Sequence, residues 1–155
     1  PTYDENKIDK RAEAVAMLVE STRKDIIEIL KLARIEKPKK ITLFIADEWK
    51  YDFMKMLRKE MEKTRNQANL IKALVSTDLK IYSLEIAKLV PKLLNDETKI
   101  PHVILSQETE FHALNDASKN YENEFKCKVE VIAAEKSKEN KAKQSLPGKA
   151  AILVE

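Results

Sequence analysis

Chemically reactive side chains are few in this sequence and lie far apart. It contains two histidines, His102 and His112, and one cysteine, Cys127, among 155 residues. Two histidines and one thiol are too few for a metal site with the usual ligand spacing. We interpret Cys127 as a small core residue, because no basic partner that would activate its thiolate can be named. The single glycine, Gly148, excludes a Walker loop and a GxGxxG turn, which need several glycines.

Neighbouring carboxylates are the other groups that could do catalytic work. Asp47/Glu48 and Glu108/Glu110 each fall at the predicted start of a helix, where the macrodipole favours negative charge. We therefore interpret both pairs as helix-start residues. His112 falls outside the apolar stripe of its helix and is predicted to be solvated. We expect no catalytic residue, metal or cofactor in this chain.

Basic residues are unevenly distributed along the chain. Residues 36–80 contain eleven basic and seven acidic side chains, and residues 136–155 contain five and two. Residues 81–135 between them are acidic, with six basic and ten acidic side chains. This distribution could direct basic surface toward a polyanion. Ordinary solvated surface is the alternative interpretation.

Three β-type segments predict a small sheet that would position these residues. Residues 41–46 form a nearly continuous apolar run, residues 127–134 alternate, and residues 150–155 are apolar up to Glu155. Helical patterns cover residues 6–35, the segment after Asp47, residues 67–75, residues 78–94 with a kink or split expected at Pro91, and the segment after Ser106. We expect an α/β (α+β) fold, in which a long N-terminal helix leads into a three-stranded sheet packed with about four helices.

The segment LPGKAAILVE, residues 146–155, is unusual because chain termini are more often polar. It predicts a last strand beside residues 127–134, entered through a turn at Gly148. The Lys-rich residues 135–149 before it are expected to form a loop that buries nothing. The helix over residues 6–35 would be about 45 Å long, more than a domain of this size covers. It indicates packing against further helices, with a coiled-coil dimer as the alternative.

Two motifs carry a resemblance to a known family. The stretch IEKPKKITLFIADEWKYDFMK (residues 35–55) follows a long amphipathic helix, and LPGKAAILVE ends the chain. Both resemble the C-terminal region of archaeal-type leucyl-tRNA synthetases, and the spacing of EFKCKVEV (residues 124–131) fits as well. The resemblance spans the chain, although residues 64–105 match in helical pattern only and Asp47 stands where a proline or small residue is expected. It implies that residues 1–36 are the terminal helix of the anticodon-binding bundle and residues 37–155 a C-terminal tRNA-binding domain.

The resemblance also implies a function for the protein to which this chain would belong. Such a parent is a cytoplasmic class I ligase that joins leucine to its tRNA with ATP and magnesium. Its catalytic signatures, a His-Gly pair and a Lys-Met-Ser-Lys-Ser loop, are absent from this sequence. The chain would therefore contact the long variable arm of leucine tRNA, support aminoacylation, and have that tRNA and the remaining synthetase domains as its partners.

Site residues follow from the same resemblance. Ile152 and Val154 would offer apolar surface to unstacked bases, as proteins do when they bind RNA loops and ends. Glu155 would accept a hydrogen bond from an exocyclic amine. Backbone phosphates would be met by lysines without reading sequence, namely Lys149, Lys136, Lys138, Lys141, Lys143, Lys39 and Lys40.

One alternative function remains open from the residues alone. The long helix could pair with a partner protein in a stand-alone interaction module with no RNA specificity. Trp49 is interpreted as a core residue and not as a platform for bases. The chain starts at Pro1 without a methionine, which we expect of a piece cut from a longer protein. The single cysteine fits a reducing compartment, and no run of about 18 apolar residues could span a membrane.

Overall fold

The computed structural model describes the backbone of residues 5–155 and the side chains from Lys10 onward. Five α-helices and three strands form an α+β fold, as the sequence predicts. The helices are α1 (Glu5–Leu32), α2 (Glu48–Met61), α3 (Gln67–Val75), α4 (Ser83–Asn95) and α5 (Gln107–Phe125). The strands are β1 (Lys40–Ile45), β2 (Lys128–Ala133) and β3 (Ala151–Val154), and short 3-10 helices are η1 (Asp78–Tyr82), η2 (Glu97–Lys99), η3 (Ala134–Lys136) and η4 (Asn140–Gln144).

The strand order in the sheet is β2-β1-β3. β1 pairs with β2 in parallel and with β3 antiparallel. The prediction that the last strand lies beside β2 is therefore wrong, because β3 pairs with β1 on its other side. The reason is burial: β1 has apolar or buried side chains on both faces, so it must be the central strand. The more exposed β2 then becomes an edge strand.

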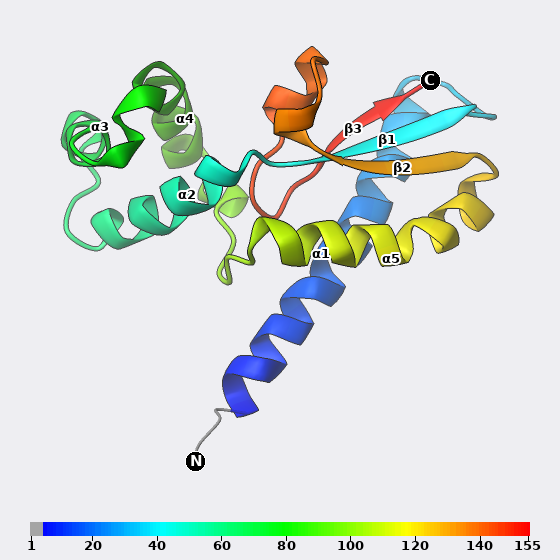
Figure 1. Cartoon of the computed structure of the whole chain (residues 1–155), viewed down its shortest axis with the longest axis horizontal. Coiled ribbons are helices and arrows are strands. Elements are labelled where there is room, and N and C mark those ends of the chain that lie inside the picture. The colour runs from blue at the N-terminus through cyan, green and yellow to red at the C-terminus, as the bar shows by residue number, and fades with distance from the viewer. Residues whose placement is uncertain (1–4) are drawn as a thin grey trace.

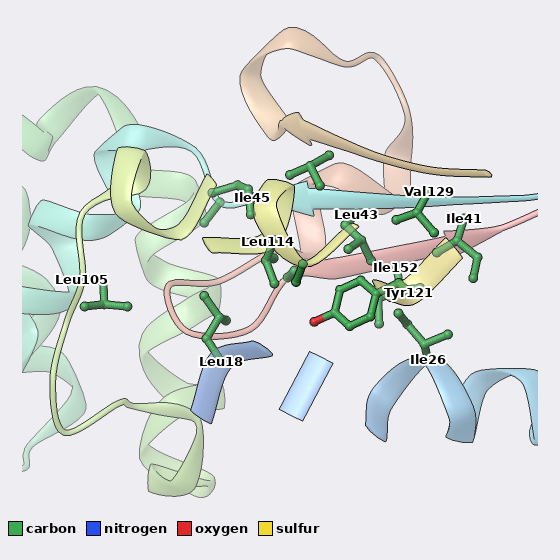
Figure 2. Close-up of a cluster of buried hydrophobic side chains, with 14 of the residues drawn as sticks. Leu18, Ile26, Ile41, Leu43, Ile45, Leu105, Leu114, Tyr121, Val129 and Ile152 are labelled. Atoms are coloured by element: carbon green, nitrogen blue, oxygen red, sulfur yellow. The ribbon is translucent and has the colours of Figure 1, made fainter. Parts of the chain in front are cut away.

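One face of the sheet packs against α1 and α5 (Figure 1). Figure 2 shows this core, in which Ile41, Leu43 and Ile152 of the sheet meet Ile26 of α1 and Tyr121 of α5. The Tyr121 hydroxyl donates a hydrogen bond to the Val19 carbonyl at 2.6 Å, so the buried ring also ties the two helices together. Because side chains alternate between the two faces of a sheet, the inward residues of each strand are two positions apart.

Residues 134–144, drawn in orange in Figure 1, cover part of the other face of the sheet. Ala142 of η4 packs there with Phe44 and Ala151, and it is fully buried. The prediction that residues 135–149 bury nothing is wrong. Small side chains let this lysine-rich segment approach the sheet closely, while its lysines stay at the surface.

The helices α2, α3 and α4 enclose a second core of their own. Phe53, Leu70 and Ile86 are completely buried at its centre. The expected split at Pro91 does not occur, because α4 continues through it to Asn95. The helix predicted over residues 78–94 instead starts as η1 and becomes α-helical at Ser83.

The helix α1 ends at Leu32, three residues earlier than predicted. Arg34 takes up a left-handed conformation with φ 56°, and the Ile35 N–H donates back to the Leu30 carbonyl at 2.9 Å. This is the Schellman stop that usually has a glycine in the position of Arg34, so the sequence gives no sign of it. The first half of α1 projects away from the sheet in Figure 1, and Met17 is 71% exposed. None of the helices in the described part of the chain is both long and apolar enough to cross a bilayer.

Candidate nucleic-acid interface

The end of the chain is held at the beginning of β1 by main-chain hydrogen bonds. The Lys39 N–H donates to the Glu155 carbonyl at 2.7 Å, and the Glu155 N–H donates to the Lys40 carbonyl at 2.8 Å. Three of the predicted site residues therefore lie at the same end of the sheet. The side chains of Lys39 and Glu155 are both exposed there.

An uncovered part of the sheet lies beside this end. Because side chains alternate between faces, Lys40, Lys128, Glu130, Leu153 and Glu155 share the face opposite α1 and α5. We call these five residues the open sheet face. η4 packs on the same side over Phe44 and Ala151, and Leu153 packs partly against that cluster. All five residues are nevertheless exposed or half-buried.

Lys40 is not a free cation on the open sheet face. Its Nζ lies 2.7 Å from a carboxylate oxygen of Glu130 on the neighbouring strand. The hydrogen bond and the charge of Glu130 raise the pKa of Lys40, and the same contact lowers the pKa of Glu130. Binding of a phosphate at Lys40 would therefore compete with Glu130.

The apolar tail residues divide between the two faces of the sheet. Ile152 is 4% exposed and lies in the core with α1 and α5, as Figure 2 shows. The expectation that Ile152 offers apolar surface to a base is therefore wrong. Val154 points to the same side and is half-buried against that core. The apolar residue on the open sheet face is Leu153, which was missed because the alternation alone does not say which face is uncovered.

Lys141 and Lys143 lie on η4, which is anchored by a buried lysine. The Lys50 Nζ donates to the main-chain carbonyls of Lys143 and Ser145, both at 2.8 Å. Lys50 is 4% exposed, and this burial lowers its pKa. No sequence signal could have found this role, because a lysine in the first turn of a helix is usually solvated.

Trp49 is half-buried and packs against the core of α2, α3 and α4, in line with its interpretation as a core residue. Its ring stacks on that of Tyr82, with centroids 4.3 Å apart and planes 7° apart. It also meets the edge of Phe53 and contributes to the second core. Because both neighbours are internal partners, Trp49 is not a free platform for a base.

Lys149 lies in the turn before β3, away from the open sheet face. Lys149 is six residues from Glu155, a separation that a fully extended chain spans with at most about 20 Å. The turn is closed by paired hydrogen bonds between Leu146 and Lys149, and Gly148 has φ +81°. The structure thus does not bring all ten predicted site residues together.

A buried carboxylate fixes this turn. One oxygen of Glu110 accepts the Tyr51 hydroxyl, and the other accepts the Gly148 N–H at 2.7 Å. Glu110 is 3% exposed, and burial raises its pKa to about 7. The interpretation of Glu110 as a helix-start charge overlooked this role. Its place four residues before Leu114 on the buried stripe of α5 was the available signal.

The remaining reactive side chains form no chemical centre. Within the described residues, no three histidine, cysteine, aspartate or glutamate side chains are grouped to hold a metal ion. His112 is exposed, as predicted, and its imidazole lies 3.7 Å from the Glu108 carboxylate. Cys127 is half-buried and packs against the first core.

Comparison with known proteins shows which sequences this chain resembles. The leucine–tRNA ligase of Methanococcus aeolicus is 33% identical and aligns with all of this chain and 15% of the ligase. That of Methanococcoides burtonii is 30% identical and aligns with all of this chain and 17% of the ligase. The chain is homologous to part of the leucine–tRNA ligases. The leucine–tRNA ligase of Pyrococcus horikoshii, at 27% identity, covers 92% of the chain.

The homology confirms the resemblance to archaeal-type leucyl-tRNA synthetases. No protein-family profile matches the chain. The chain spans about one sixth of the length of the leucine–tRNA ligases that it matches, which is consistent with the expected C-terminal region.

Proposed function

We propose that this chain is a tRNA-binding part of a leucine–tRNA ligase and contacts the long variable arm of leucine tRNA to support aminoacylation. The observation that carries the proposal is the pairing of Glu155 with Lys39 and Lys40 beside an uncovered sheet face. A tail held by main-chain hydrogen bonds presents its exposed groups in a fixed geometry. Such preorganised groups suit the reading of unstacked RNA bases.

Four groups at this end of the sheet have defined parts in this proposal, two of them, Leu153 and Glu155, on the open sheet face. Leu153 provides apolar surface for a base, in place of Ile152. Glu155 accepts a hydrogen bond from an exocyclic amine, and Lys39 meets a neighbouring phosphate. Val154 contributes the edge that its partial burial leaves exposed.

The lysines of η3, of η4 and of the loop between them extend the basic surface along the same side of the sheet. Lys136, Lys138 and Lys143 are exposed, and Lys141 is half-buried. Because Lys50 fixes the main chain of η4, these cations are held near the sheet at little entropic cost on binding. They add affinity that depends on salt and not on sequence.

The chemistry of the ligase belongs to the rest of the parent protein. ATP and magnesium would act in its catalytic domain, and the aminoacylation reaction would take place there in the cytoplasm. The present chain would bind tRNA and pack against the other synthetase domains. Residues 1–36 would be the terminal helix of the anticodon-binding bundle, and residues 37–155 the tRNA-binding domain.

The test is binding of the 155-residue chain to leucine tRNA, serine tRNA and a short-armed tRNA at two salt concentrations. The test variant is Lys39→Gln with Glu155→Gln, which removes two exposed groups but leaves the main-chain hydrogen bonds. The matched control is Lys119→Gln with Asp116→Asn, a lysine and a carboxylate on the exposed side of α5. Removal of residues 150–155 is a poorer test, because it also removes β3 and its core residue Ile152.

We expect a preference for leucine tRNA that the test variant loses and the control keeps. Equal binding of all three tRNAs by the unmodified chain would contradict the proposal. Association with a partner through α1, with no preference among RNAs, would instead support the interaction-module alternative.

A further inference from the structure

A depression of about 340 Å³ lies between α2 and the segment that leads from η2 to α5. It is lined by Lys55, Arg58, Lys59, Glu62 and Ile104, and we call it the α2 groove. Lys55, Arg58 and Lys59 of α2 and Glu62 at its C-cap fall at steps of three and four, so they share one side of the helix. Because one helix and one loop residue form the whole lining, the groove is an open channel and not a closed pocket.

The charges in the α2 groove are unbalanced. Three basic side chains meet a single carboxylate, that of Glu62. Elsewhere, Arg23, Lys40 and Arg65 each lie in a salt bridge. Within the described part of the chain, no carboxylate lies within salt-bridge distance of Lys55, Arg58 or Lys59. The groove therefore holds cations that the fold itself does not neutralise.

The position of Arg58 is set by the loop opposite α2. Its Nη1 donates to the main-chain carbonyl of His102, which leaves the other guanidinium donors available. Ile104 is half-buried and adds an apolar patch to the floor. A positioned guanidinium, two flexible ammonium groups and an apolar floor match a sugar–phosphate chain, whose phosphates attract cations while its sugars cover apolar atoms.

We propose that the α2 groove binds backbone phosphates of the same RNA that the open sheet face contacts. This inference rests on the proposed function, because the homology to leucine–tRNA ligases is what favours RNA over other polyanions. It accounts for the basic character of residues 36–80, which Lys39 and Lys40 explain only in part. Phosphate contacts carry no sequence information, so the groove adds affinity and the open sheet face adds discrimination.

The test measures leucine tRNA binding by the whole chain as a function of salt. The groove variant is Lys55→Gln with Lys59→Gln, and the matched control is Lys72→Gln with Lys88→Gln, two exposed lysines on α3 and α4. Both variants lose the same charge and keep their helices. Thermal unfolding confirms that both remain folded, and a short-armed tRNA and polyglutamate are titrated beside leucine tRNA.

We expect the groove variant to bind leucine tRNA about 10-fold more weakly, with the slope of log K against log salt reduced by about 1 to 2. Its ratio of affinities for the two tRNAs should be unchanged, and the control should differ from the unmodified chain by less than about 2-fold. A groove variant that behaves like the control would overturn the inference, as would equally tight binding of polyglutamate to the unmodified chain. Loss of discrimination in the Lys39/Glu155 variant, measured in parallel, tests the proposed function separately from the groove.

Discussion

Glu110 connects three elements through a single carboxyl group. It lies on α5, accepts the hydroxyl of Tyr51 from α2, and accepts the N–H of Gly148 from the turn before β3. Burial without a cationic partner is expensive for a carboxylate, which is why its pKa rises to about 7. The free energy of folding is therefore linked to the protonation of this one group.

We expect the free energy of unfolding to fall as the pH rises from about 4.5 to about 7. The folded-state pKa lies above the ordinary value of 4.5, so protonated Glu110 stabilises the fold and its ionisation removes that contribution. Relative to Glu110→Gln, which stays neutral, the native chain should lose up to about 3 kcal/mol over this range. Urea unfolding at pH 4.5, 6 and 7.5 measures the difference, and parallel pH profiles for the two proteins would contradict this assignment.

The conformation of the turn depends on its one glycine. Gly148 has φ +81°, and a Cβ built there would lie 3.3 Å from Cβ and Cγ of Pro101. Gly148→Ala should lower stability by about 1–2 kcal/mol, because an L side chain is strained in this region. Chemical denaturation gives the value. Ser145→Ala would be an unsuitable control because its hydroxyl is buried, whereas Gln144→Ala, exposed in the same segment, should have little effect.

At the scale of elements, η4 depends on α2 for its position. Two main-chain carbonyls, those of Lys143 and Ser145, share the ammonium group of Lys50. An element this short cannot be stable on its own hydrogen bonds. Lys141 and Lys143, which are proposed to contact RNA, are thus positioned by the buried side chain of Lys50.

Lys50→Met should destabilise the chain by about 2 kcal/mol, because two buried carbonyls lose a charged donor. Removing a buried charge offsets part of this loss. Hydrogen exchange should show faster exchange of amides in residues 140–146, with amides of α3 unchanged. If the amides of residues 140–146 exchanged at the same rate in the variant as in the unmodified chain, Lys50 would not hold η4 in place.

Elements were predictable where a hydrophobic pattern identifies them. The run ITLFIA predicts both ends of β1 to within one residue. The side chains of Asn66 and Ser106 cap α3 and α5, so the starts of these helices are marked in the sequence as well. The position of β3 was mispredicted, although the continuous apolar run of β1 was the available signal for a central strand. Ile152 was misassigned for a different reason, since the covered face depends on where α1 packs. Glu110 and Lys50 act through contacts about 60 and 90 residues distant in sequence, which no local pattern reports.

At the scale of the whole molecule, α1 has one face buried against the sheet and apolar side chains exposed on another. Leu18 and Ile26 lie in the core beside the sheet, whereas Met17 and Leu32 are more than 70% exposed. The homologous leucine–tRNA ligases are about six times longer than this chain. The boundary near residue 36 between bundle helix and tRNA-binding domain remains a prediction, and the second half of α1 contributes directly to the core of the α/β part.

The central position of β1 has a consequence for the order of folding. Lys40 pairs with Lys128, and Ile41 pairs with Val154. Both neighbours of β1 are therefore strands that lie roughly a hundred residues away in the sequence. The helices α2 to α4, in contrast, supply nearly all of their buried core from one continuous stretch, to which only Leu146 is added from a distant part of the chain. Contacts between distant residues form slowly because closing a long loop costs entropy. The helices α2 to α4 should therefore assemble first and shorten the loop between the strands. The α2 groove would then form early, and the open sheet face would be the last part of the molecule to form.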